Sequence, residues 1–76
     1  MKELLHFVCG YLVDDPEQVK IETLEGQRAV ILQVYVAPED MGKVIGRGGR
    51  TAKAIRTVVR AAAQRQGHGA MVDIED

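Results

Sequence analysis

The chain has 76 residues, of which 46% are hydrophobic, a formal net charge of −1 and one cysteine, Cys9. This length allows a single compact domain, residues 1–76, and the apolar content is too high for a disordered chain. The sequence has no apolar run near the ~20 residues of a membrane span, no secretory cleavage pattern, no cysteine pair and no metal-site spacing, so we expect a cytoplasmic protein without membrane segment, disulfide, cofactor or metal.

Residues 2–13 predict an amphipathic helix, because leucine and valine recur at helical spacing along one face. Cys9 is expected to be buried there as a small apolar residue. Phe7 and Tyr11 widen the apolar arc, so they predict either further core packing or a dimer contact. Asp14-Asp15-Pro16 ends the helix, since the residue before proline avoids helical geometry.

Two strands are expected next, over residues 18–24 and 28–36, because β-branched and other apolar residues recur at every second position in both. The turn at residues 25–27 contains Gly26, which can adopt a positive φ. The second segment is apolar on both faces, which is typical of a strand in the centre of a sheet.

Two helices and a strand complete the chain. Ala37-Pro38-Glu39-Asp40 begins a short helix that ends at Gly46, because proline and acids favour the first turn of a helix. A longer amphipathic helix spans residues 50–66, and a short strand follows over 70–75. The order α-β-β-α-α-β predicts an α+β fold.

The near-neutral net charge hides a basic segment between residues 43 and 65. This segment contains seven basic residues and no acid, while all 11 acidic residues lie elsewhere in the chain. The seven are Lys43, Arg47, Arg50, Lys53, Arg56, Arg60 and Arg65. A charge segregated in this way usually marks the binding site of a polyanion, whereas a merely solvated helix face would mix both signs.

Gly46-Arg47-Gly48-Gly49 joins the two helices of the basic segment. Glycines let the backbone approach a ligand closely, and the start of the following helix favours a phosphate. Arg47, Arg50 and Lys53 add cations around this point. The spacing fits neither a Walker A loop nor a dinucleotide-binding fingerprint. The loop therefore predicts contact with a sugar-phosphate backbone, and the simpler alternative is a tight connection between helices.

Residues 44–55, with their hydrophobic-Ile-Gly-x-x-Gly signature, resemble the core of a KH domain. The run at residues 49–56 and the length of the chain are similar to the small single-KH-domain bacterial RNA-binding proteins, the KhpA-like family. This resemblance covers the whole chain. It implies a type II KH domain in which three helices pack on one face of a three-stranded mixed sheet.

The resemblance also implies a groove for about four nucleotides of single-stranded RNA. Its floor would include Ile45 and Ile55, and the edge of the strand at residues 28–36 would read the bases. KH grooves need no aromatic platforms, which agrees with a chain that has one Phe, two Tyr and no Trp. The RNA-binding residues implied by the resemblance are Lys43, Ile45, Gly46, Arg47, Gly48, Gly49, Arg50, Thr51, Lys53, Ile55 and Arg56.

No pair of acids and no Ser/His/Asp or Cys/His arrangement accompanies the glycine loop, so we expect no enzyme. We expect single-stranded RNA binding, and the resemblance implies post-transcriptional regulation as an RNA chaperone or adaptor. It also implies a homodimer or a heterodimer with another KH-containing protein. Two alternatives stay open: a protein-assembly adaptor that binds RNA incidentally, and a protein that binds single-stranded DNA.

Overall fold

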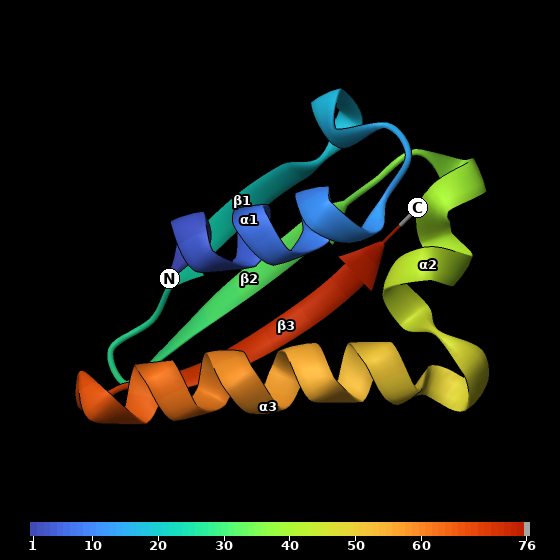
Figure 1. Ribbon diagram of the computed structural model, residues 1–76. Coiled ribbons are helices and arrows are strands. Elements are labelled where there is room, and N and C mark those ends of the chain that lie inside the picture. The colour runs from blue at the N-terminus through green and yellow to red at the C-terminus, as the bar shows by residue number, and fades with distance from the viewer. Residues whose placement is uncertain (76) are drawn as a thin grey trace.

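The computed structural model describes residues 1–75 of the chain. Within this range the elements follow the predicted order (Figure 1). They are α1 (Lys2–Leu12), β1 (Lys20–Glu25), β2 (Ala29–Tyr35), α2 (Met41–Ile45), α3 (Arg50–Arg65) and β3 (Gly69–Glu75). The first strand begins two residues later than predicted, because Pro16–Gln18 forms a 3₁₀ turn in which proline occupies the first position.

The sheet has the strand order β1-β2-β3, with β1 and β2 antiparallel and β2 and β3 parallel. The prediction that the second strand lies in the centre is therefore confirmed. Opposite residues such as Leu32 and Val72 form the layer that faces the helices. A parallel pair needs a crossover connection, which α2 and α3 provide here.

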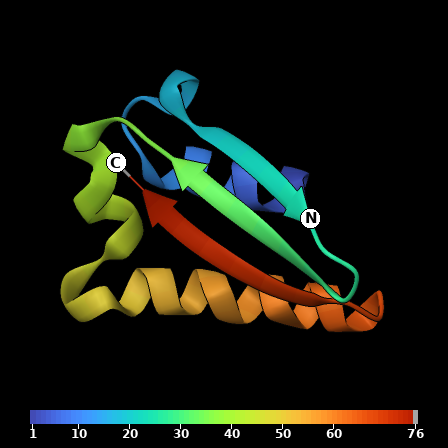
Figure 2. The same ribbon diagram turned by 180° about the vertical axis from the view of Figure 1, so that it is seen from behind.

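The helices cover one face of the sheet, as the two opposite views in Figures 1 and 2 show. This arrangement agrees with the predicted α+β fold of three helices on one face of a mixed sheet. The other face has no covering element among the described residues, and its Leu24 and Met71 are 52% and 53% exposed. None of the helices of the described chain is both long enough and apolar enough to cross a membrane.

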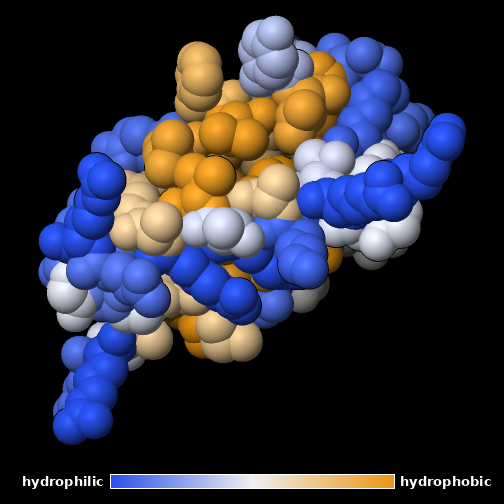
Figure 3. All heavy atoms as spheres, turned by 60° about the horizontal axis from the view of Figure 1, so that its bottom comes forward, coloured by the Kyte–Doolittle hydropathy of each residue, from blue (hydrophilic) through white to orange (hydrophobic). Residues whose placement is uncertain are grey.

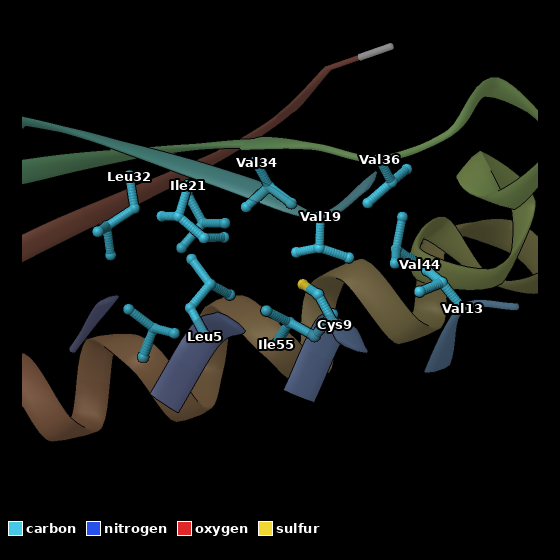
Figure 4. Close-up of a cluster of buried hydrophobic side chains, with 12 residues drawn as sticks. Leu5, Cys9, Val13, Val19, Ile21, Leu32, Val34, Val36, Val44 and Ile55 are labelled. Atoms are coloured by element: carbon cyan, nitrogen blue, oxygen red, sulfur yellow. The ribbon is translucent and has the colours of Figure 1, made fainter. Parts of the chain in front are cut away.

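One apolar core joins α1, α3 and the inner face of the sheet (Figure 4). Leu5 and Cys9 of α1 are completely buried and point toward the strands, and Val59 of α3 is 2% exposed. The prediction that Cys9 is buried is confirmed, and this burial raises the pKa of its thiol. A core of this kind holds α3 against the sheet and so fixes where its basic residues lie.

Phe7 and Tyr11 do not contribute to the core, so the prediction that they pack there is wrong. Their side chains are 71% and 84% exposed. The reason is the helical repeat, because positions 7 and 11 lie well over 90° around α1 from Leu5 and Cys9. Both aromatic rings extend the apolar surface of α1 into solvent.

Candidate nucleic-acid interface

The glycine loop turns sharply between α2 and α3 because three of its residues adopt backbone angles that favour glycine. The φ values of Gly46, Gly48 and Gly49 are +77°, +64° and +78°. The N–H of Gly49 donates to the carbonyl of Gly46 at 3.1 Å, which closes the turn. A Cβ atom at Gly46 would collide with the side chain of Thr51, whereas one at Gly48 would meet no atom within 4 Å. The outer side of the loop at Gly48 is therefore open to a ligand.

The start of α3 is suited to an anion. Its N-cap is Gly49, no side chain caps it and its first turn contains no acid. Because α3 has 16 residues, its dipole places partial positive charge at this end. An anion at the loop would meet this charge as well as the exposed loop backbone.

Three cations surround the loop and make no ion pairs within the described part of the chain. Arg47, Arg50 and Lys53 are exposed, and the ion pairs found among the described residues involve none of them. Their charges are therefore free to contact phosphate groups. The structure brings these three side chains to the same end of α3 as the glycine loop, as the sequence predicted.

Arg56 connects α3 with the outer strand of the sheet. Its Nε donates to the carbonyl of Val72 in β3 at 3.1 Å, and the side chain is half-buried. This carbonyl therefore faces the outer edge of β3 and not β2. Lys53 and Arg60 lie on the same flank of α3 as Arg56, because residues three and four apart share a helix face. The basic flank thus runs beside the outer edge of β3 (Figure 2).

The expectation that the strand at residues 28–36 offers its edge to bases is wrong. Both edges of β2 are hydrogen-bonded, one to β1 and the other to β3. The apolar character that places β2 in the centre of the sheet also removes its free edge. The strand with an open edge beside α3 is β3.

Ile45 and Ile55 lie in different surroundings. Ile45 is 38% exposed at the end of α2, directly before the loop. Ile55 is 5% exposed, belongs to the core and lines a groove between α1 and α3. The position of Ile55 on α3 therefore suits packing against α1, and Ile45 is the apolar side chain available beside the loop.

Lys43 is engaged with two carboxylates. Its Nζ lies 3.1 Å from Oδ2 of Asp14 and 3.4 Å from Oδ1 of Asp40. The hydrogen bond and charge of Asp14, and then those of Asp40, raise the pKa of Lys43. Because Lys43 and Ile45 lie about 160° apart around α2, the ammonium points to the opposite flank from Ile45. Lys43 is thus separated from the free cations at the loop.

Asp40 is the residue that sequence reasoning missed, since it was interpreted only as an acid at a helix start. It is 2% exposed, and its carboxylate accepts the N–H groups of Asp14 at 3.3 Å and Asp15 at 3.1 Å. Burial alone would raise the pKa of Asp40, but these two hydrogen bonds and Lys43 lower it. The pattern Asp-x-x-Lys was the available signal, because residues three apart meet on a helix.

The fold and the loop together define a KH domain: helices and a mixed sheet in the order α-β-β-α-α-β, with Gly-x-x-Gly between the second and third helices. The sequence model of the family described as "KhpA/KhpB, KH domain" matches residues 2–74. The chain belongs to this family.

Proteins named "RNA-binding protein KhpA" are similar over nearly the whole chain. The protein of Clostridium acetobutylicum is 50% identical over 74 residues, which cover 97% of this chain and 99% of the relative. That of Clostridium perfringens is 51% identical with the same coverage. That of Mycobacterium tuberculosis is 45% identical over 93% of this chain and 84% of the relative. These names describe RNA-binding proteins, which agrees with the expectation of a non-enzymatic RNA-binding protein. No solved structure matches the chain significantly.

Proposed function

We propose that this protein binds single-stranded RNA without catalysing a reaction, and that the glycine loop holds the RNA backbone. The observation that carries the proposal is an open Gly-x-x-Gly loop surrounded by three exposed cations that make no ion pairs with the described residues. The relatives named as RNA-binding proteins favour RNA over other polyanions. The proposed contacts are Ile45, Gly46, Arg47, Gly48, Gly49, Arg50, Thr51, Lys53 and Arg56.

In this proposal phosphate contacts supply most of the affinity. The loop backbone and the start of α3 receive one phosphate, and Arg50 and Lys53 neutralise its neighbours. Bases would lie toward Ile45 and the outer edge of β3, where Arg56 already contacts the Val72 carbonyl. Lys43 and Ile55 support the scaffold, since one is ion-paired and the other is buried.

Reversing the charge of Arg50 is expected to weaken RNA binding about tenfold, whereas the same change at Arg60 has little effect. Both arginines are exposed on α3, but Arg60 lies about 15 Å further along the helix, beyond the Debye length of ~8 Å. The measurement is fluorescence anisotropy with a labelled single-stranded RNA of about ten nucleotides at several salt concentrations. Because Arg50→Glu loses one phosphate contact, its salt slope, the steepness with which log affinity falls as log salt concentration rises, should be lower by about 0.7.

Equal losses in Arg50→Glu and Arg60→Glu would contradict a site centred on the loop and would indicate unspecific binding along the basic flank. A single-stranded DNA of the same sequence, measured at the same salt concentration, tests the DNA alternative. Failure of the wild type to bind either nucleic acid would favour the protein-assembly adaptor.

We further propose that the protein acts as a pair of KH domains, as a homodimer or with another KH-containing protein. An open apolar groove of about 240 Å³ lies between α1 and α3 and is lined by Leu4, Val8 and Val58, among others. Val58 is 51% exposed within it, and Phe7 and Tyr11 extend the same apolar side of α1. Figure 3 shows the apolar surface bordered by hydrophilic side chains on the side of α3. Arg47 and Gly48 do not line this groove, so pairing would leave them free and raise the affinity of two weak sites for one RNA.

Val58→Asp is expected to convert the dimer to a monomer, because a carboxylate in an apolar contact would lose its hydration. The measurement is sedimentation equilibrium between micromolar and millimolar protein, with Gln64→Asp, another exposed position on α3, as the matched control. A wild type that is monomeric at all concentrations contradicts the homodimer and leaves the heterodimer. In the cell we place this activity in the cytoplasm, in post-transcriptional regulation as an RNA chaperone or adaptor.

A further inference from the structure

Asp40 joins two segments of the chain that are distant in sequence. It directly precedes α2, and its carboxylate accepts the backbone N–H groups of Asp14 and Asp15, which follow α1. Lys43, one turn along α2, lies 3.4 Å from Asp40 and 3.1 Å from Asp14. The cluster therefore connects the end of α1 to the beginning of α2. A carboxylate that is 2% exposed can remain ionised here because all its partners are donors.

The short helix α2 depends on such an anchor. It has only five residues, too few to be stable by itself, and of these only Val44 is buried in the core. Its other end, Ile45, directly precedes Gly46, the first residue of the glycine loop. The position of the loop relative to α3 therefore depends on what holds α2, namely Val44, the partly buried Met41 and the contacts of Asp40.

We propose that Asp40 is a positioning residue for RNA binding, which fixes α2 and thereby the glycine loop through its bonds to Asp14, Asp15 and Lys43. This inference rests on the proposed function of the loop. Asp40 itself does not contact RNA, since its carboxylate is buried among its protein partners. Lys43 serves the same cluster and is not a phosphate contact.

Asp40→Asn is the test variant. Its amide retains one acceptor oxygen, so one of the two backbone N–H groups loses its partner. The ammonium of Lys43 loses the carboxylate of Asp40 and keeps only that of Asp14. We expect the variant to remain folded by circular dichroism and its affinity for single-stranded RNA to fall at least about fivefold. Hydrogen exchange of the amides between residues 41 and 49 should become faster, while exchange in β2 stays slow.

Leu32→Val is the matched control, because Leu32 is 1% exposed and lies at the opposite end of the core from Val44 (Figure 4). Binding is compared at temperatures equally far below the unfolding midpoint of each variant. Equal losses of affinity in both variants would show a merely structural effect and would overturn the positioning role. Wild-type affinity in Asp40→Asn would overturn it as well.

Lys43→Met separates the cluster from a direct phosphate contact. We expect an unchanged salt slope, whereas a slope lowered by about 0.7 would show that Lys43 contacts phosphate and would overturn its assignment to the cluster. Arg50→Glu in the same assay tests the proposed function independently. If Arg50→Glu binds like the wild type, the loop site is wrong. If it loses affinity while Asp40→Asn does not, only the positioning role is wrong.

Discussion

Replacing Arg47 and Gly48 together by aspartate is expected to abolish RNA binding while the fold stays intact. Both residues are exposed, and a Cβ at Gly48 meets no atom within 4 Å. The backbone of Gly48, with φ 64° and ψ 18°, is left-handed, and aspartate is among the residues that adopt this conformation. The two replacements make the net charge of the loop more negative by about three units, two from Arg47 and one from Gly48. At about 1 kcal/mol per charge pair in water, the loss is about 3 kcal/mol, or roughly 100-fold in affinity.

The measurement is fluorescence anisotropy with single-stranded RNA, after circular dichroism and thermal unfolding have been compared with the wild type. Gly48→Asn alone is the control, because it introduces a side chain of the same size at the same backbone angles without a charge. It should retain most of the affinity. If the double variant binds RNA as the wild type does, the loop is only a connection between helices.

Replacing Gly46 by alanine is expected to have the largest effect on stability in the loop. Its backbone angles, φ 77° and ψ 171°, fall in a region that essentially only glycine occupies. The new Cβ would also collide with the side chain and backbone nitrogen of Thr51. Backbone strain and overpacking cost about 1–3 kcal/mol each. A sum of about 2–6 kcal/mol is a large part of the stability of a domain of this size, so thermal unfolding should occur at least about 8 °C lower.

Gly42→Ala is the matched control, because Gly42 lies in α2, one turn before Gly46, and has no positive φ. Its new Cβ would lie more than 4 Å from any neighbouring group outside the helix's own backbone. Alanine favours a helix over glycine, so this variant should be equal to the wild type or up to about 1 kcal/mol more stable. The measurement is differential scanning calorimetry, which gives the unfolding midpoint of each variant and of the wild type. An unchanged midpoint for Gly46→Ala would mean that the loop adopts a different backbone conformation.

The sequence alone was sufficient where the signal was local. Apolar periodicity predicted the strands and the two longer helices, and proline with acids predicted the short helix. The segment that is apolar on both faces predicted the central position of β2. The glycine loop and the basic segment were recognised from adjacent residues, and the structure brings Arg47, Arg50 and Lys53 together because they lie within two turns of one loop-helix junction. Patterns of this kind depend on neighbours along the chain, so a single sequence contains them.

Tertiary structure decided which flank of each helix faces which neighbour. Ile55 and Lys53 stand two residues apart on α3, yet one is buried toward α1 and the other is exposed. Lys43 is as basic as Lys53, but the approach of Asp14, 29 positions earlier in the chain, places its ammonium in ion pairs. The open edge of β3 depends on the order of the strands. These outcomes come from contacts between residues far apart in sequence, whose geometry exists only once the core has packed.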